Sequence, residues 1–443
     1  MQKNLLAVAV AAALAAPAVA MAQSSVTISG ALNLWVEQAG ATGSTAPGTA
    51  TATSFDVKPR SRMQDGAGSN IRFTAVEDIG GGLQGFGQVE SAVFTNADTR
   101  TNTLGAAGST GGWGTRNSGV GLRGSAWGEI LLGIWDIHYQ ESYAVDNQII
   151  TGASHTSSLA LLNTFGTPGW SSLNPTIGGR LNNVVRYASP NWGGFTFNAE
   201  YSRPTDGLVS TAAVGGVALP VEGKKNAVMN IAPKFNMGGL HVGYSWYQDK
   251  DLTTTANATG LYNGASNAPA GAAGMTAAGS VNKITSNRFQ AAYTFPFGLK
   301  IGAIYDRSKW EAIGNTVAAL SSELKRDVWS VPLSYAIGPH TVFATYAKAN
   351  KLKGNIGGAD LSNITVTPVG GTGQTMDSGT GAKFYSFGYQ FALSKRTNIH
   401  MSYSQVKNDS LAGYDFFSNT VGMANGNYGA DPKSLALGIR HTF

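Results

Sequence analysis

Apolar and polar residues alternate with a period of two along much of the chain, the pattern of β-strands whose successive side chains point to opposite faces. Over residues 195–202, aromatic and small apolar residues share one face while Thr, Asn, Glu and Ser share the other. The same alternation returns over 240–247, 288–295 and 384–391, and aromatic residues crowd the apolar face. Stripes with the 3.6-residue period of amphipathic helices are hard to find. The pattern therefore predicts an all-β protein.

Two kinds of connection separate these segments, and they alternate strictly along the chain. Seven are tight and carry residues favoured in hairpin turns, at 78–82, 125–128, 191–194, 236–239, 297–298, 338–339 and 394–397. Eight are long and polar, at about 38–67, 96–114, 136–181, 204–223, 249–284, 308–324, 350–380 and 408–431. Together these turns and loops predict sixteen antiparallel strands.

The lengths of the strands fit a transmembrane β-barrel. Outside the loops about 12 residues remain for each strand, and roughly 9 to 11 are needed to cross a bilayer at a tilt. An even number of antiparallel strands closes into a cylinder without an open edge, which lipid could not satisfy. Pro332 interrupts one strand, so we expect a bulge there. A secreted β-sandwich or propeller is the alternative fold, but its connections would lack the alternation of short and long.

Composition agrees with a barrel and excludes several other classes. Only 13% of the 443 residues are charged, which is few for a soluble protein, while 42% are hydrophobic and 10% aromatic, which argues against disorder. Outside the N-terminus, no run of about 20 apolar residues could form a transmembrane helix. The absence of Cys excludes disulfides, thiolate metal sites and cysteine nucleophiles.

The N-terminus has the three parts of a secretory signal peptide. Lys3 supplies the positive charge, residues 5–19 form an Ala-rich apolar core, and residues 20–22 (Ala-Met-Ala) form a cleavage site. We therefore expect residues 1–22 to be removed on export, which leaves residues 23–443 as the β-barrel domain.

No enzymatic site stands out. The six His residues have no metal-ligand spacing such as H-E-x-x-H, and a G-x-S-x-G nucleophile elbow is absent. Residues 119–124 match G-x-G-x-x-G, but a strand rather than a helix is expected to follow, so a dinucleotide would find no helix N-terminus. Clusters of Lys and Arg interleaved with aromatics, typical of nucleic-acid binding, are also missing. We therefore expect no catalysis, metal, cofactor or nucleic-acid partner.

Four parts of the sequence resemble the general diffusion porins of Gram-negative bacteria, particularly those of β-proteobacteria. They are Ser24–Gly30, Glu77–Leu83 followed by Gln88–Ser91, Asn183–Phe195 and Leu437–Phe443. The last ends an amphipathic strand on a C-terminal aromatic residue, which resembles the signal that the barrel-assembly machinery reads in outer-membrane proteins. The resemblance therefore implies that Phe443 is the assembly signal.

The same resemblance implies an architecture and partners. It implies a sixteen-stranded barrel in the cell outer membrane, with short periplasmic turns, long extracellular loops and a third loop, about 136–181, that folds inward to narrow the pore. Asp136, Glu141 and Asp146 are then candidates for the acidic side of this constriction. It also implies a homotrimer in contact with outer-membrane lipid and lipopolysaccharide. One departure is the lack of the Arg that family members often carry at the end of the fifth strand.

If the aromatic and aliphatic faces point to lipid, parity places the opposite faces in the lumen. These faces carry bases at Arg72, Arg123, Arg186, Arg288, Lys300 and Arg440, and acids at Glu90, Glu200 and Asp306. Because the strand bases outnumber the strand acids, we predict a weak preference for anions. The three loop acids would balance the count, so this prediction depends on the strand residues.

The expected function is a water-filled channel for passive diffusion of small hydrophilic solutes and ions. A substrate-specific channel on the same barrel is one alternative. A surface adhesin that acts through its long loops is an alternative of another class, and it would conduct no ions.

Overall fold

The computed structural model describes a set of ranges that covers most of the expected strands. They are residues 25–45, 56–65, 68–93, 113–147, 154–166, 177–203, 208–214, 217–222, 227–251, 281–313, 322–356, 358–366, 373–417, 421–423 and 428–443. The expected signal peptide, residues 1–22, lies outside them.

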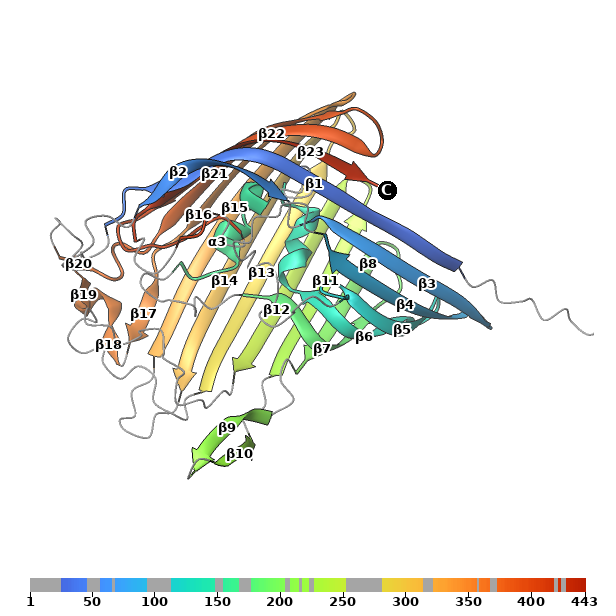
Figure 1. Ribbon diagram of the computed structural model, residues 1–443, viewed down its shortest axis with the longest axis horizontal. Helices are drawn as coiled ribbons and strands as arrows, with labels where there is room; N and C mark the ends of the chain where they lie inside the picture. The colour runs from blue at the N-terminus through green and yellow to red at the C-terminus, as the bar shows by residue number, and fades with distance from the viewer. Residues whose placement is uncertain are drawn as a thin grey trace, which may run out of the picture.

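Sixteen antiparallel strands form the wall of a barrel, as predicted (Figure 1). They are β1 (Ser25–Thr42), β3 (Asn70–Gly80), β4 (Leu83–Ala92), β5 (Ser118–Gly124), β6 (Gly128–Ile137), β7 (Gly179–Ala188), β8 (Phe195–Ser202), β11 (Ala227–Met237), β12 (Leu240–Asp251), β13 (Val281–Thr294), β14 (Leu299–Ile313), β15 (Ser322–Ile337), β16 (His340–Ala349), β21 (Ala382–Ala392), β22 (Thr397–Asn408) and β23 (Asp431–Thr442).

The barrel closes where its first strand meets its last. β1 pairs with β3 on one side and with β23 on the other, where the register begins at Ala31↔Thr442. Beyond this pair the main chains of Gly30 and Phe443 exchange two hydrogen bonds, of 3.0 and 3.1 Å. Closure leaves no edge in the wall, so every strand has a partner on both sides.

All seven predicted hairpin turns are confirmed. They join β3 to β4, β5 to β6, β7 to β8, β11 to β12, β13 to β14, β15 to β16 and β21 to β22. Gly298, in the β13–β14 turn, has a φ of 95°, and a Cβ there would collide with the carbonyl oxygen of Ala336. Glycine is required at this position because both the conformation and the space exclude a side chain.

Three of the predicted loops contain strands that periodicity did not reveal. β2 (Val57–Asp65) falls within the expected loop 38–67 and pairs with the far half of β1, from Leu34↔Asp65. The wall is therefore taller here than predicted. The expected loop 204–223 contains a separate hairpin, and the connection after β16 contains several short elements. These are β9 (Leu208–Val214), β10 (Val217–Glu222), β17 (Lys353–Ile356), β18 (Ala359–Asp360), η3 (Leu361–Asn363), β19 (Thr365–Val366) and β20 (Gln374–Thr375).

The expected bulge at Pro332 is wrong. β14 and β15 pair as far as Ile301↔Leu333 and resume at Ile304↔Ser330 in the same register. On its other side Pro332 lies opposite Thr345 in an unbroken ladder with β16. Proline has no N–H to donate to a neighbouring strand. The sheet accommodates Pro332 by leaving out a hydrogen bond at this position, and no extra residue is inserted.

The outer and inner faces of the wall differ as the alternation predicts. On β23, Leu435, Leu437 and Ile439 are about half exposed and point away from the barrel, whereas Ser434 and Ala436 are buried toward its interior. Among the described residues, no helix is long and apolar enough to cross a membrane.

Candidate functional site

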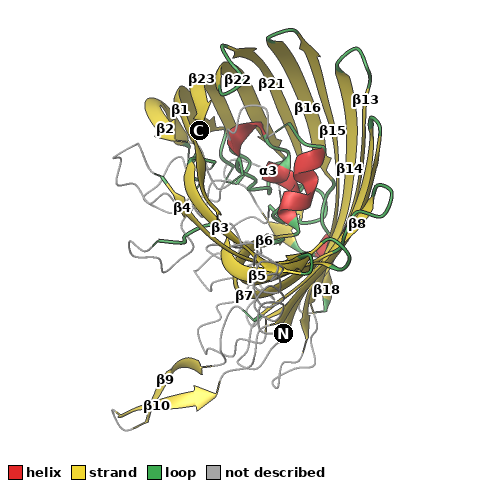
Figure 2. Ribbon diagram, turned by 90° about the vertical axis from the view of Figure 1, so that its right-hand side faces the viewer, coloured by secondary structure: helices red, strands yellow, loops and turns green. Residues whose placement is uncertain are grey.

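The connection between β6 and β7 enters the barrel instead of extending away from it. Its helical segments lie within the ring of strands (Figure 2), and they are η1 (Tyr139–Ala144), η2 (Ser154–Thr156) and α3 (Leu159–Leu162). We call this connection the inner loop. Both of its ends are strained or tightly packed: His138 has φ 65° and ψ −58°, a γ-turn conformation that side chains rarely adopt, and Gly178 has φ 79°.

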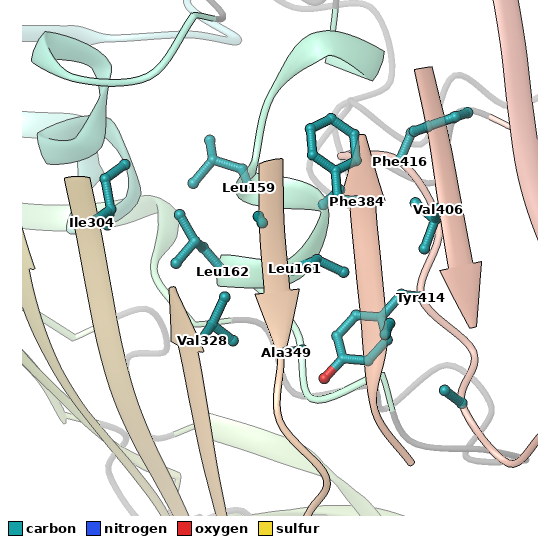
Figure 3. Close-up of a cluster of buried hydrophobic side chains, with 14 of the residues drawn as sticks. Leu159, Leu161, Leu162, Ile304, Val328, Ala349, Phe384, Val406, Tyr414 and Phe416 are labelled. Atoms are coloured by element: carbon teal, nitrogen blue, oxygen red, sulfur yellow. The ribbon is translucent and has the colours of Figure 1, made fainter. Parts of the chain in front are cut away.

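Apolar side chains fix α3 to the wall (Figure 3). Leu159, Leu161 and Leu162 are fully buried and pack among inward-facing residues of the strands and residues of the last long loop. The cluster includes Ile304, Val328, Ala347, Ala349, Phe384, Val406, Tyr414 and Phe416. These inward apolar residues break the rule that a lumen is polar, because they meet the loop and not water.

Two arginines and an aspartate of the wall hold the end of α3, and we call them the latch. Arg326 donates hydrogen bonds to the carbonyl oxygens of Leu161 (Nη1, 2.7 Å) and Leu162 (Nη2, 2.9 Å). Arg288 Nη2 also donates to the Leu162 carbonyl, at 3.2 Å. Asp306 lies between the two guanidinium groups and accepts from Arg288 Nε at 2.9 Å and from Arg326 Nη2 at 3.3 Å. All three latch side chains are inaccessible to solvent.

His138 and His155 fix other parts of the inner loop. The two ring nitrogens of His138 lie 2.8 Å from Ser245 Oγ and 3.0 Å from Ser286 Oγ, while His155 Nε2 lies 2.9 Å from Ser402 Oγ. Burial lowers the pKa of each imidazole to about 4. Both rings are therefore neutral at pH 7 and serve as hydrogen-bonding anchors.

Asp146, expected at the constriction, instead organises the inner loop. Its carboxylate accepts hydrogen bonds from Ser157 Oγ (2.7 Å) and from the main-chain N–H of Ser158 (3.0 Å). The neighbouring Asn147 donates through Nδ2 to the carbonyl oxygen of Leu333 on β15, at 3.0 Å. Asp146 is buried, and burial raises its pKa. It therefore closes one turn of the loop on another.

The other two acids predicted for the constriction are buried and paired with wall bases. Glu141, in η1, lies 2.7 Å from Lys234 Nζ on β11. Asp136 lies on β6, before the loop begins, and its Oδ1 is 2.9 Å from Arg180 Nε on β7. Each negative charge is therefore matched locally by a positive one.

A second group of bases lies on the wall formed by β3 to β5. Glu90, which is buried, accepts hydrogen bonds from Arg72 Nη2 at 2.7 Å and from Arg116 Nε at 2.5 Å. The side chain of Arg72 is 40% exposed. One carboxylate thus serves two guanidinium groups, and we call these three residues the Glu90 triad. On the adjoining part of the wall, Arg62 Nη2 of β2 lies 2.7 Å from Glu37 Oε1 of β1.

The remaining predicted bases all point into the barrel but have different partners. Arg186 lies 3.0 Å from Glu129 and 3.4 Å from Glu200. Arg123 donates to Gln84 Oε1 at 2.9 Å, and Lys300 donates to the carbonyl oxygen of Ala144 in the inner loop at 2.7 Å. Arg440 lies on β23 opposite Asn33 of β1.

Several charged residues of this interior were not among the predicted site residues. Arg62 was assigned to a loop because the strand that carries it was not recognised, and Arg180 was assigned to the inner loop. Arg116 lies two residues before β5, and its guanidinium group reaches back to Glu90 on β4. Lys234 and Arg326 share the inward parity of their strands, so the alternation could have identified both.

Among the described residues, no three His, Asp or Glu side chains come together in a way that could hold a metal ion. The interior instead contains paired charges, and in both the latch and the Glu90 triad two arginines share one carboxylate. Such an arrangement can act on charged solutes by its field rather than by bond chemistry.

Comparisons with known proteins agree with this architecture. The family model described as Gram-negative porin matches residues 7–411. No curated protein matches the sequence. The anion-selective porin from Comamonas acidovorans has a similar structure, with a TM-score of 0.56 and 18% identity over 95% of this chain and 100% of that chain. OmpT of Vibrio cholerae in its trimer form gives a TM-score of 0.56 and 14% identity over 95% and 99%. At identities of 18% and 14%, these two structures show that this chain shares their fold.

Proposed function

The chain belongs to the Gram-negative porin family and forms a passive diffusion channel of the outer membrane, and we propose that this channel weakly prefers anions. The solutes we propose are small, hydrophilic molecules and inorganic ions. The observation that carries the preference is the Glu90 triad, in which one carboxylate faces two guanidinium groups and Arg72 remains partly exposed. An excess of positive charge beside a narrow aqueous path raises the local concentration of anions.

Other features support the same sign of selectivity. Arg123 and Lys300 have uncharged hydrogen-bond partners, so their positive charges are not matched by these contacts. The acids proposed for the constriction, in contrast, are buried beside bases or within the inner loop. The Comamonas porin, which shares the fold, is described as anion-selective.

Ion selectivity is tested by the reversal potential of purified protein in planar bilayers that separate two KCl concentrations. We expect the sign that corresponds to chloride permeating faster than potassium, reduced at high ionic strength because salt screens the charges. A potential of the opposite sign would overturn the proposed preference. Saturable block by a single solute would replace general diffusion by a substrate-specific channel, and the absence of any conductance would favour an adhesin.

We also propose that the channel is a homotrimer, in line with the trimeric form of the related fold from Vibrio cholerae. Conductance that disappears in three equal steps, together with the mass of the detergent-solubilised complex, tests this. Cleavage after residue 22 is tested by N-terminal sequencing of the mature protein, which should begin at Gln23. Recognition of Phe443 by the assembly machinery is tested by deleting this residue, which should reduce the amount of folded protein in the membrane.

A further inference from the structure

Four lysines lie in a row on the outer face of the wall, near the ends of the strands that lead into the long loops. Lys348 of β16 is directly opposite Lys383 of β21, which is in turn opposite Lys407 of β22. Lys433 of β23 pairs with Gln405 and so lies diagonally next to Lys407. Like charges directly opposite each other destabilise a sheet. We call these four residues the lysine row.

The described part of the chain supplies no acid within ion-pair distance of the lysine row. Asp431 is near enough to Lys407 and Lys433 to interact electrostatically, but its Oδ1 accepts the main-chain N–H of Asn408, at 2.9 Å. Lys383, Lys407 and Lys433 are exposed. Their positive charges therefore face the surroundings of the barrel.

The neighbouring strands provide an internal comparison, because lysines on their outer face are neutralised. Glu323 of β15 lies 2.6 Å from Lys309 Nζ and 2.5 Å from Lys325 Nζ. Glu311 of β14 lies 3.4 Å from Lys283 Nζ. Glutamates thus separate the lysines on β13 to β15, whereas the lysine row has no such residues among its cross-strand partners.

Below the lysine row, the same outer face carries tyrosines together with apolar residues. Tyr346 of β16 is opposite Tyr385 of β21, with ring centroids 5.2 Å apart. The next outward residue of β21, Phe387, is about half exposed and lies opposite Tyr403 of β22. Tyrosine marks the interface between headgroups and acyl chains. Since two residues along a strand span about 7 Å, the lysine row lies at the level of the headgroups.

We infer that the lysine row is a binding site for the phosphate-bearing headgroup of an anionic lipid in the outer leaflet. This inference rests on the outer-membrane location of the barrel, but not on its ion selectivity. Phosphate oxygens would accept charge-assisted hydrogen bonds from adjacent ammonium groups and remove the repulsion between them. The acyl chains of the same lipid would lie against the tyrosines and the apolar residues beneath them.

The test measures binding of diphosphoryl lipid A to the folded, detergent-solubilised protein by native mass spectrometry. The variant K383Q/K407Q removes two charges of the row, and we expect its dissociation constant to rise about 30-fold. The matched control K283Q/K325Q removes two outward lysines from the strands on which glutamates neutralise them, and it should change binding by less than about threefold. K383R/K407R should retain binding, and monophosphoryl lipid A should bind more weakly than the diphosphoryl form.

Heat-dependent migration in detergent gels and an unchanged conductance establish that K383Q/K407Q is folded, and they keep this test separate from that of the channel. Equal binding by K383Q/K407Q and the unaltered protein would overturn the inference, as would an equal loss in the control variant. Displacement of the lipid by millimolar inorganic phosphate would overturn the assignment to a lipid and identify a site for the free anion. Loss of the oligomer in K383Q/K407Q would identify the lysine row as a contact between copies of this chain.

Discussion

The guanidinium group of Arg326, on β15, donates a hydrogen bond of 2.7 Å to the main-chain carbonyl of Leu161, in the inner loop. The two residues are 165 positions apart in the sequence. The carbonyl groups at the end of α3 have no partner within this short helix, and the latch supplies one. The position of the inner loop is therefore decided by residues of the opposite wall.

Replacing Arg326 with Met should loosen the inner loop. The change leaves Asp306 with one guanidinium partner and leaves the Leu161 carbonyl buried without its donor. Removal of one member of a buried charge cluster costs about 3–5 kcal/mol. We expect a lower unfolding midpoint in denaturant and a noisier, larger single-channel current. The control is R307M on β14, whose ion pair with Asp327 is exposed and should contribute nothing measurable. A quiet single-channel current in R326M, unchanged from that of the unaltered protein, would contradict the claim that the latch holds the inner loop in place.

Glu90 and Arg72 should shift ion selectivity in opposite directions. E90Q leaves two guanidinium groups without a carboxylate, whereas R72Q removes one positive charge from the lumen. One elementary charge about 7 Å from the path of the ions, in water, changes the local concentration of each ion by roughly two- to threefold, in opposite directions for chloride and potassium, so their unscreened permeability ratio changes by about four- to ninefold. The chloride-to-potassium ratio from reversal potentials should therefore rise in E90Q and fall in R72Q. E311Q, on the outer face, should have no effect, and equal ratios in all three variants would rule out control by the triad.

Acid should weaken the attachment of the inner loop through its buried histidines. Burial lowers the pKa of His155 to about 4, so between that value and about 6.5 the unfolded chain binds more protons than the folded one. Stability is therefore complete above pH 6.5 and falls as the pH decreases toward 4, by roughly 3 kcal/mol for this group. Glu37, Arg62 and His400 are the charged or titratable groups that face it.

The pH dependence is measured as the thermal unfolding midpoint between pH 4 and pH 7.5. Gln can replace the hydrogen bond of His155 to Ser402 without titrating, so H155Q should flatten the profile. His138 has a similarly lowered pKa, and the double variant H138Q/H155Q should flatten it further. A double variant whose profile superimposes on that of the unaltered protein would exclude these histidines as the cause.

Gly30 should be intolerant of any side chain because it lies at the seam of the barrel. A Cβ at this position would collide with the carbonyl oxygen of Asn70 and lie 2.7 Å from Cζ of Phe443. We expect G30A to reduce the yield of folded barrel, measured by heat-dependent migration in detergent gels. Gly87, on β4, has open space where a Cβ would be, so G87A is the matched control. Equal folding of the two variants would show that the seam tolerates the added methyl group.

Local patterns were sufficient to predict the wall of the barrel. The alternation at Leu435, Leu437 and Ile439 correctly identified an outward apolar face. Short segments that contain glycine, such as Phe297-Gly298, correctly identified the turns. Strand periodicity and turn geometry depend on neighbours a few residues apart, so they can be predicted from the sequence. β2 was missed because its segment, Val57–Asp65, carries charged and polar residues on both faces.

The sequence by itself determined the sixteen strands of the wall, their seven tight turns and the faces on which Arg72, Arg288 and Glu90 lie. Only the tertiary structure decided that Arg288 is covered by the inner loop while Arg72 remains partly exposed, and that Asp146 closes the loop on itself. The position of a residue in the alternation of its own strand specifies whether its side chain points into the lumen or away from it. Burial and ion pairing depend on what lies across the lumen, often more than a hundred residues away in the chain, and no local pattern contains that information.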